Sequence, residues 1–478
     1  QKTFKQLEHE TSSLASGLIQ SGMKSGNRVL LMVPYGIDFV MLTFAMFKAG
    51  LVPVLIDPGQ GKKSILDCIQ QIQPDGMIAI PFAHAVRKIF PGPFKSIKHY
   101  VSTGWFWGCK TLRQVLVSGK KDFKLKSMDE EDPAAILFTS GSTGPAKGVL
   151  YTHSIFNHQI KILQEQFDIQ SNETDLPTFP LFGLFSCGLG MTSIIPDMDA
   201  TRPARVNPET ITGSINQFKV SSSFGSPALW DTVSQYCLKK NIKLPTIKRI
   251  IMAGAPVSGK LLSRFENIVN VDCKIQTPYG ATEALPVSLI DRREILDQTW
   301  PLSNKGEGIC VGKAIPGAEI KIISVSDSPI LKWEKAIPLS LNTVGEIVIK
   351  APWATRTYFN REDLTQLAKI EDENSFWHRM GDLGRLDEKN RLWFYGRKNQ
   401  RVIAETETLY TIPCESIFNQ HPDVKRSALV GTGPRTKQEP AIIIEPAKAN
   451  KKKSSKERNK FTEELLKLGA TSHLTQSI

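Results

Sequence analysis

A short apolar run that leads directly into a loop of hydroxyl groups and glycines is the most constraining stretch of this chain. Residues 134–138 read Ala-Ala-Ile-Leu-Phe, which is typical of a buried strand. Residues 139–148 then read Thr-Ser-Gly-Ser-Thr-Gly-Pro-Ala-Lys-Gly. Glycines let backbone N–H groups approach an anion closely, and the hydroxyls and Lys147 suit phosphate oxygens. The pattern predicts a strand followed by a binding loop for a polyphosphate, most simply a nucleoside triphosphate.

Two other interpretations of this loop are less favourable. Ser, Thr and Gly are common in flexible surface turns, but a linker does not need four hydroxyls, three glycines and a lysine directly after a strand. A P-loop requires Gly-Lys followed by Ser or Thr, whereas Ala146 precedes Lys147 and Gly148 follows it. The loop also lacks the Gly-x-Gly-x-x-Gly pattern, so a dinucleotide site has no support here.

Composition excludes several classes of protein. The 478 residues allow two to four domains, and 41% hydrophobic with 22% charged residues is ordinary for a globular enzyme. No apolar window is long enough for a membrane span, and no signal-peptide pattern opens the chain. The chain starts inside a helix-like segment, so we expect that its natural N-terminus is missing. Seven scattered cysteines without zinc-site spacing favour reduced thiols in a cytoplasmic protein.

The net charge of +13 is partly local. The basic run at residues 451–460 has no interleaved aromatic residues, so a solvated loop or linker is the favoured interpretation. An anionic surface, such as membrane headgroups or an acidic partner, is the alternative, and peripheral membrane contact is therefore an expectation. No nucleic-acid-binding motif is present, and nucleic acid is not an expected partner.

Strand and helix patterns alternate over the first 300 residues and predict an α/β fold. The continuous apolar strands favour mostly parallel sheets layered with helices. Strands are expected at residues 29–33, 52–56, 76–80, 221–224 and 247–253, and helices at 3–20, 38–48 and around 230–238. Thr3 and Gln6 fit a capping box at the start of the first helix.

The pattern changes near residue 300, where short strands alternate with turns. We expect a large N-terminal domain at residues 1–396, with a β-rich subdomain at about 300–396. A small α+β domain is expected at residues 397–478, with a helix at 413–420, strands at 424–430 and 441–445, and a helix at 461–468. We also expect this small domain to be incomplete at Ile478.

Four further motifs follow the loop at long intervals. They are Tyr-Gly-Ala-Thr-Glu at 279–283, Gly-Glu-Ile at 345–347, a Gly-Asp-Leu-Gly turn at 381–384 and Gly-Arg-Lys at 396–398. Each is weak alone. In this order they resemble the adenylate-forming superfamily of acyl-CoA synthetases, luciferases and peptide-synthetase adenylation domains, over nearly the whole chain.

The resemblance implies a reaction and a set of roles. Such enzymes join a carboxylate to the α-phosphate of ATP with Mg²⁺ and release pyrophosphate. Thr282 would bond the α-phosphate, Glu283 would ligate Mg²⁺ with help from Thr143, and Lys147 would act in catalysis. Tyr279 would stack on adenine, and Asp382 would bind the ribose with Arg397 nearby. The remaining expected nucleotide-binding residues are Thr139, Ser140, Gly141, Ser142, Gly144, Gly254, Ala255, Pro256 and Gly280, and Asn399 is the expected hinge.

Each role has a structural alternative. Tyr279 could be a core aromatic residue, Glu283 a surface carboxylate and Asp382 the cap of a turn. Arg397 could form an interdomain salt bridge in place of a ribose contact. For His153, a structural role is at least as well supported as a catalytic one.

Other segments carry a narrower resemblance. Residues 55–59, 179–185, 196–205 and 409–415 resemble the β-lactone synthetases of bacterial long-chain olefin biosynthesis. Those relatives adenylate a 2-alkyl-3-hydroxy fatty acid, whose own hydroxyl then attacks the activated carbonyl and closes a four-membered ring. The resemblance implies a long-chain acid as substrate and partner enzymes of a lipid pathway.

An acyl-CoA synthetase is the main alternative, and coenzyme A is expected only in that case. Acyl-CoA ligases usually carry a glycine pair after the Gly-Arg junction, whereas residues 404–408 read Ala-Glu-Thr-Glu-Thr. An acyl pocket is expected at Phe182, Phe185, Phe224 and Gly225, although core packing explains the phenylalanines equally well.

The catalytic lysine that the superfamily carries near the end of its small domain cannot be assigned in this sequence. A non-catalytic nucleotide-binding scaffold that recruits a partner through the basic run therefore stays as a remote alternative. Acyl chain length and oligomeric state are not determined by any pattern in the chain.

Overall fold

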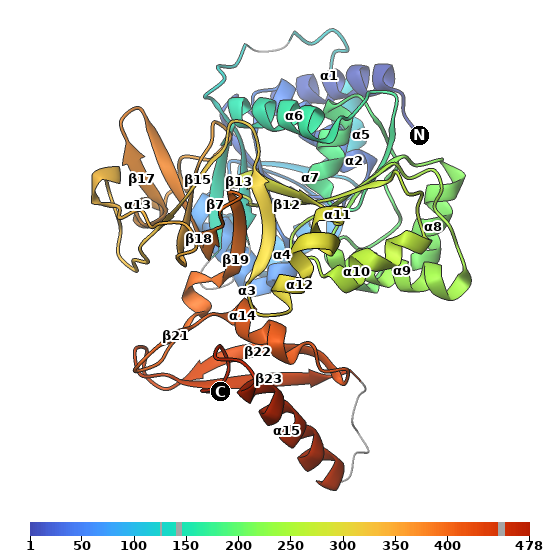
Figure 1. Cartoon of the computed structure of the whole chain (residues 1–478). Helices are drawn as coiled ribbons and strands as arrows, with labels where there is room; N and C mark the ends of the chain where they lie inside the picture. The colour runs from blue at the N-terminus through green and yellow to red at the C-terminus, as the bar shows by residue number, and fades with distance from the viewer. Residues whose placement is uncertain (125–126, 140–145, 448–454) are drawn as a thin grey trace.

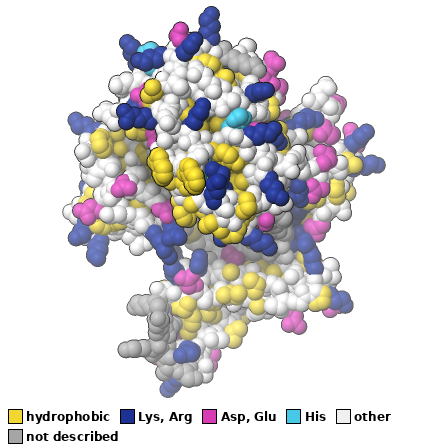
Figure 2. Space-filling view, turned by 180° about the vertical axis from the view of Figure 1, so that it is seen from behind, with side chains coloured by type: hydrophobic (Ala, Val, Ile, Leu, Met, Phe, Trp, Pro, Cys, Tyr) yellow, Lys and Arg dark blue, Asp and Glu magenta, His cyan; other side chains and the backbone are white. Residues whose placement is uncertain are grey.

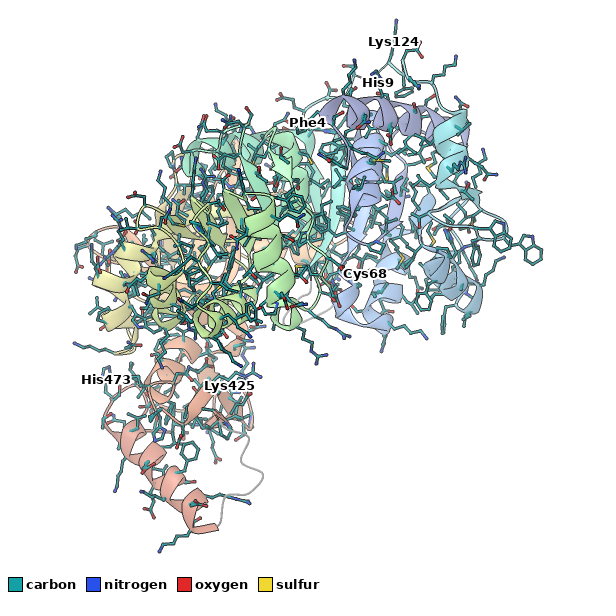
Figure 3. All side chains as sticks on the ribbon, turned by 90° about the vertical axis from the view of Figure 1, so that its right-hand side faces the viewer. Phe4, His9, Cys68, Lys124, Lys425 and His473 are labelled. Carbon is teal, nitrogen blue, oxygen red and sulfur yellow. The ribbon has the colours of Figure 1, made fainter. Side chains whose placement is uncertain are left out.

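The computed structural model describes residues 1–124, 127–139, 146–447 and 455–478. Figure 1 shows a main body of sheets and helices, with a smaller part formed by the end of the chain below it. In the side view of Figure 3, Phe4 and His9 mark α1 at the top of the main body, and Lys425 and His473 mark the smaller part. The α/β fold with layered sheets predicted from the sequence is confirmed.

A seven-stranded sheet forms the N-terminal half of the main body. Its strand order is β5-β4-β3-β1-β2-β6-β7, and all neighbours are parallel except β6 and β7. The strands are β1 (Arg28–Met32), β2 (Val52–Ile56), β3 (Gly76–Ala79), β4 (His99–Ser102), β5 (Lys110–Thr111), β6 (Pro133–Thr139) and β7 (Lys147–Thr152). The helices associated with it are α1 (Phe4–Gln20), α2 (Ile37–Lys48), α3 (Lys62–Ile72), α4 (Pro81–Ile89) and α5 (Leu112–Ser118).

The first helix begins where the sequence predicts. Thr3 accepts a hydrogen bond from the backbone N–H of Gln6, whose side chain accepts one from the backbone N–H of Thr3. This reciprocal capping box satisfies donors that the first turn leaves unpaired. Leu14 and Leu18 of this helix are fully buried and pack against α2. The capping box therefore stabilises the start of the helix, and its apolar side fixes the helix against its neighbour.

The second sheet has twelve strands and forms the other half of the main body. Its order is β15-β16-β18-β19-β14-β13-β12-β11-β10-β8-β9, with β17 paired to β18. Strands β8 to β12 run parallel, and the pairs from β12 onward are antiparallel. The strands are β8 (Thr174–Pro177), β9 (Thr192–Ser193), β10 (Ser222–Gly225), β11 (Arg249–Met252), β12 (Lys274–Ala281), β13 (Ala284–Asp291), β14 (Ile309–Ala314), β15 (Glu319–Ile323), β16 (Gly345–Lys350), β17 (Lys369–Asp372), β18 (Ser375–Leu386) and β19 (Arg391–Arg397). The β-rich region is thus hydrogen-bonded into the same sheet as the preceding α/β units.

Helices complete the layers around this sheet. They are α6 (His153–Phe167), α7 (Pro180–Gly188), α8 (Pro208–Gln217), α9 (Pro227–Lys240), α10 (Gly259–Arg264), α11 (Arg292–Glu294), α12 (Trp300–Ser303) and α13 (Glu362–Ala368). Trp230 of α9 is fully buried beside Phe265 in the largest apolar cluster. Among the described residues, none of the helices has both the length and the apolar character needed to cross a membrane.

The C-terminal part contains β20 (Val402–Ile403), β21 (Thr408–Leu409), α14 (Thr411–Phe418), β22 (Val424–Thr432), β23 (Glu439–Pro446) and α15 (Ser455–Ala470). The prediction of a loop across the whole basic run is wrong, because residues 455–460 form the first turns of α15. Lysine and arginine are good helix formers, and Leu465 is buried on one side of this helix. Residues 451–454 lie outside the described residues.

Candidate functional site

The motif Tyr279–Glu283 lies at the tip of a β-hairpin. Strand β12 ends at Ala281, β13 begins at Ala284, and Thr282 and Glu283 form the two-residue turn between them. A Cβ on Gly280 would lie 2.5 Å from the backbone oxygen of Ala284, so only glycine allows the two strands to approach this closely. The Tyr151 hydroxyl donates to the Thr282 carbonyl at 2.5 Å and ties the tip to β7. The hairpin therefore fixes the position of Thr282 and Glu283, two of the three predicted catalytic residues.

Three predicted ligand-binding residues meet at one carboxylate. Tyr279 donates its hydroxyl to Asp382 Oδ2 at 2.7 Å, and Arg397 donates to Oδ1 at 2.8 Å. Asp382 is buried and Arg397 is 44% exposed at its side chain. Burial raises the pKa of Asp382, while Arg397 and the tyrosine hydroxyl oppose that rise. Because each carboxylate oxygen has two lone pairs, Asp382 retains capacity for further hydrogen bonds.

The prediction that residues 381–384 form a turn is wrong. They lie inside β18, where Asp382 pairs with Arg397 of β19 and the register shifts between Leu383 and Gly384. Gly381 has φ of 69°, so the strand bends at this glycine while its ladder continues. Arg397 pairs within the large sheet in this structure, and not across to the C-terminal part.

Glu283 has a different environment from Asp382. Its Oε1 accepts a hydrogen bond from the Tyr358 hydroxyl at 2.6 Å, and its backbone oxygen accepts one from the Thr355 N–H at 2.8 Å. No second hydrogen bond to the carboxylate is found within the part of the chain that the structure describes. Tyr358 thus orients the Glu283 carboxylate, whose other oxygen, Oε2, is open in the sense that no described residue donates a hydrogen bond to it.

Cationic side chains surround this carboxylate. The Lys147 ammonium lies 5.0 Å from the centre of the Tyr358 ring. Lys369 of β17 is buried, donates to the Thr355 carbonyl and lies 3.1 Å from His378 Nδ1. Burial lowers the pKa of Lys369 to about 7, with Glu283 opposing and Lys147 adding to the fall. Burial and Lys369 also hold the pKa of His378 well below its ordinary value.

The donor chemistry at Glu283 fits Mg²⁺. This ion prefers oxygen ligands and usually binds one or two carboxylates together with phosphates and water. The open oxygen of Glu283 is such a ligand. Among the described residues no group of three or more His, Cys, Asp or Glu side chains could hold a metal alone. A Mg²⁺ ion held by Glu283 would take its other ligands from phosphates, water and the predicted ligand Thr143.

The glycine-rich loop itself cannot be placed. Ser140, Gly141, Ser142, Thr143 and Gly144 lie outside the described residues, and Thr139 is described only as the last residue of β6. Lys147, at the start of β7, pairs with Thr139 in the strand register and thus lies at the base of the loop. Gly254, Ala255 and Pro256 form an exposed turn after the carboxyl end of β11, where Gly254 has φ of 95°.

The expected acyl-pocket residues are tightly packed. The Phe182 and Phe224 rings stack with centroids 3.3 Å apart, and Phe185 meets Phe182 edge-on. All three are buried in one apolar cluster that includes Leu163. A Cβ on Gly225 would lie 2.7 Å from Trp230 Nε1, so packing alone requires glycine there. The contacts are compatible with core packing and with the wall of an acyl pocket.

The expected hinge lies between two anchored residues. Asn399 is in a short 3₁₀ helix, Lys398–Gln400. Lys398 pairs with the buried Glu346 at 2.9 Å, and Arg401 pairs with Asp327 at 2.9 Å. Glu346 also receives a bidentate ion pair from Arg379, at 3.0 and 2.8 Å. These contacts fasten the chain to the large sheet on both sides of Asn399.

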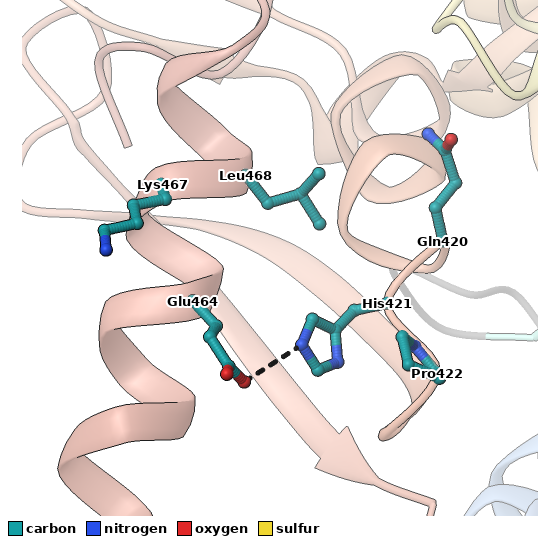
Figure 4. Close-up of a pocket in the computed structure, with 6 residues that line it drawn as sticks. All are labelled: Gln420, His421, Pro422, Glu464, Lys467 and Leu468. Atoms are coloured by element: carbon teal, nitrogen blue, oxygen red, sulfur yellow. Dashed lines mark ion pairs between the residues drawn. The ribbon is translucent and has the colours of Figure 1, made fainter.

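A shallow hollow of about 420 Å³ lies in the C-terminal part, between α15 and the turn after α14. Figure 4 shows Leu468 and the His421–Glu464 ion pair, 3.4 Å long, across it. It contains none of the residues expected to bind nucleotide.

Sequence patterns missed three residues next to the predicted site: Tyr358, Lys369 and His378. Tyr358 reaches Glu283 across 75 positions, so no local spacing could connect them. The hairpin of β17 and β18 pairs Lys369 with His378, and the intervening Glu-Asn turn was a signal that could have suggested this pairing.

The comparison with known families agrees with this arrangement. The profile of the family described as AMP-binding enzyme matches residues 1–359, three quarters of the chain. The chain belongs to the AMP-binding enzyme family. It is accordingly an enzyme of the ligase type that this family contains, and the resemblance stated from its motifs is confirmed.

Two curated members of the AMP-binding enzyme family are particularly similar. Olefin beta-lactone synthetases of Stenotrophomonas maltophilia and Xanthomonas campestris are each 41% identical, over 92% and 93% of this chain and 80% of their own length. Among solved structures, ATP-bound MatB from Rhodopseudomonas palustris has a TM-score of 0.78 at 17% identity, covering 99% of this chain and 88% of that one. This structural likeness supports the fold alone.

Proposed function

We propose that this enzyme activates a long-chain 2-alkyl-3-hydroxy acid with ATP and then closes it to a β-lactone. The observation that carries the proposal is 41% identity to two olefin beta-lactone synthetases over more than nine tenths of the chain. The site agrees with this chemistry, since it offers one carboxylate with an open oxygen among cationic groups. We also propose that residues 1–396 and 397–478 act as separate domains joined at Asn399, in the cytoplasm.

The first step forms the acyl-adenylate. A carboxylate oxygen of the acid attacks the α-phosphorus of ATP, a new P–O bond forms, and the bond to pyrophosphate breaks. Mg²⁺, held by Glu283 with Thr143, would neutralise phosphate charge. Lys147 and the hydroxyls of the loop would hold the outer phosphates, and Thr282 would bond the α-phosphate. Asp382, with Tyr279 and Arg397 already fixed beside it, would hold the ribose and adenine.

The second step needs no other acceptor. The 3-hydroxyl oxygen attacks the acyl carbon, its proton passes to solvent, and AMP leaves with the electrons of the C–O bond. Holding the hydroxyl next to the carbonyl makes this attack intramolecular. Phe182, Phe185, Phe224 and Gly225 are the proposed wall of the acyl site. Glu405 and its neighbours, with no glycine in residues 404–408, leave less space for a pantetheine arm.

The test is a product assay on the full-length protein. With a 2-alkyl-3-hydroxy acid, ATP and Mg²⁺, we expect AMP, pyrophosphate and a β-lactone detected by mass spectrometry. Appearance of acyl-CoA in place of lactone once coenzyme A is added would identify an acyl-CoA synthetase instead. If pyrophosphate exchange is silent as well, the remote scaffold alternative replaces both enzymatic proposals.

A variant tests the role of Glu283 directly. Glu283→Gln keeps an oxygen for the Tyr358 hydrogen bond but removes the charge that would hold Mg²⁺, so we expect at least a hundredfold loss of pyrophosphate exchange. Glu266→Gln, at an exposed position of the short 3₁₀ helix Phe265–Asn267, is the matched control and should keep full activity. Equal activities of the two variants would contradict the assignment.

A further inference from the structure

Two tryptophans stand out from the main body on the loop between β4 and β5. Trp105 is 81% exposed and Trp107 is 84% exposed. Trp is a large apolar residue that is highly buried on average, so two such side chains in solvent require an explanation.

The loop that carries these tryptophans is firmly held. Phe106, between them, faces inward and lies 5.4 Å from the His84 ring. Arg87 stacks over Tyr100 at 3.8 Å and donates to Cys109 Sγ at 3.6 Å. A Cβ on Gly104 would lie 3.0 Å from Pro81. Trp105 and Trp107 are therefore presented by a packed loop.

Helix α4 extends the exposed apolar surface. Phe82 and Ile89 are 74% and 68% exposed and lie seven positions apart, hence on one side of the helix. Because Phe106 and Arg87 join the loop to α4, these side chains belong to one region. We call Phe82, Ile89, Trp105 and Trp107 the tryptophan face. Figure 2, the view from behind, shows bulky hydrophobic side chains beside Lys and Arg side chains on the main body.

The segment that carries the tryptophan face is basic. Residues 76–121, which contain the whole face, include eight Lys and Arg residues and no Asp or Glu. Lys88 and Lys110 of this segment are exposed. The neighbouring helix α3 adds Lys62, whose ammonium lies 3.8 Å from the Phe90 ring at the end of α4. Helix α3 also carries the exposed Asp67, so the excess of positive charge is a property of the segment 76–121 that presents the face.

The face also lies at a defined edge of the seven-stranded sheet. Phe82 follows the carboxyl end of β3, and Trp105 follows that of β4. Strands β4, β3, β1, β2 and β6 are consecutive and parallel, so their carboxyl ends share one edge. Strand β6 ends at Thr139, four strand spacings or about 19 Å from β4. The tryptophan face and Thr139 therefore lie at the carboxyl ends of strands of the same sheet.

We propose that the tryptophan face docks the enzyme on the surface of an anionic lipid bilayer. Tryptophan is favoured at the headgroup level of membranes, and clustered Lys and Arg side chains are attracted to anionic headgroups. Both features occur here without a single acidic residue in the segment. Separate protruding rings suit a deformable lipid surface better than a shaped protein partner. The inference uses none of the residues assigned to the reaction, so it does not depend on the proposed function.

The test is sedimentation of the full-length protein with vesicles, without ATP. Vesicles of phosphatidylglycerol and phosphatidylethanolamine should bind wild-type protein at least tenfold more tightly than vesicles of phosphatidylcholine. A Trp105→Ala, Trp107→Ala double variant should lose at least tenfold in affinity, and Lys88→Gln with Lys110→Gln should weaken binding in a salt-dependent way. Leu331→Ala with Ile337→Ala, two exposed residues elsewhere, is the control and should bind as wild type.

The outcomes separate this inference from folding defects and from the reaction. Both double variants should keep wild-type circular dichroism and wild-type pyrophosphate exchange with a water-soluble short-chain acid. Equal binding to anionic and zwitterionic vesicles, or unchanged binding of the tryptophan variant, would overturn the proposal. Absence of vesicle binding together with tryptophan-dependent capture of an acidic protein would show a protein docking face instead. Silent pyrophosphate exchange with normal vesicle binding would contradict the proposed function alone.

Discussion

Two neighbouring residues of strand β18 face opposite electrostatic environments. Arg379 meets the buried Glu346 through a bidentate ion pair, and Lys398 joins the same carboxylate. His378, on the other side of the strand, meets the buried Lys369 at 3.1 Å. Among the described residues, no carboxylate lies within ion-pair distance of Lys369. One side of β18 therefore carries matched opposite charges, and the other carries two buried basic groups, Lys369 and His378, whose pKa values are lowered.

The difference suggests separate tasks for the two sides. A buried carboxylate with all its charge matched stabilises geometry, here the chain at Lys398, directly before the expected hinge. Buried basic groups without a carboxylate partner are costly to the folded enzyme when they carry a proton, and an anion nearby would favour their charged forms. Asp382, also on β18, belongs to the second side because Tyr279 and Arg397 orient it toward the predicted ligand. The next three predictions test this division.

Removing the compensating carboxylate should have the largest effect. Glu346→Ala leaves Arg379 buried without its partner, and we expect a loss of about 3–5 kcal/mol in the free energy of unfolding, measured by urea denaturation. Glu334→Ala, on an exposed 3₁₀ helix, is the control and should change stability by less than about 0.5 kcal/mol. A similar small change for Glu346→Ala would show that the pair is not structural.

Asp382→Ala should act mainly on ligand binding. It removes the acceptor of two oriented hydrogen bonds at the expected ribose position, so AMP affinity should fall about thirtyfold, or about 2 kcal/mol, by calorimetry. The exposed Asp363→Ala is the control for loss of an aspartate. If AMP affinity is unchanged while the protein unfolds more easily, Asp382 belongs with the structural side of the comparison.

Lys369→Met should change the pH dependence of stability. Unfolded Lys369 keeps its proton up to its ordinary pKa of 10.5, whereas folded Lys369 loses it near pH 7. Between these pH values the unfolded state binds more protons than the folded state, so Lys369 makes the free energy of unfolding rise with pH. Below pH 7, Lys369 lowers the free energy of unfolding by its full amount. The stability advantage of the methionine variant should therefore shrink by about 2 kcal/mol between pH 7 and pH 9.

The measurement is urea unfolding of wild type and variant at both pH values. Lys389→Met, at an exposed lysine, is the control and should give a difference from wild type that does not depend on pH. If the difference in free energy of unfolding between Lys369→Met and wild type is the same at both pH values, Lys369 has an ordinary pKa in the folded enzyme.

Local patterns were sufficient for much of the fold. The capping box at Thr3, the apolar run before Thr139 and the strand pattern at residues 52–56 each encode an element through their own neighbours. Patterns failed where a distant partner changes the outcome. Residues 381–384 read as a turn because glycine and aspartate favour turns, but pairing with β16 and β19 draws them into a strand.

The sequence by itself determined the family, the class of fold and the order of the motifs, because these depend on residue types and on periodicities of a few positions. Only the tertiary structure decided which groups meet: Tyr358 with Glu283, Tyr279 with Asp382, Lys369 with His378 and Phe106 with His84. The physical reason is that hydrogen bonds and burial act over a few ångströms, while the chain separates the first two pairs by 75 and 103 positions. The open oxygen of Glu283 and the exposed tryptophans of the β4–β5 loop could be identified only from the tertiary structure.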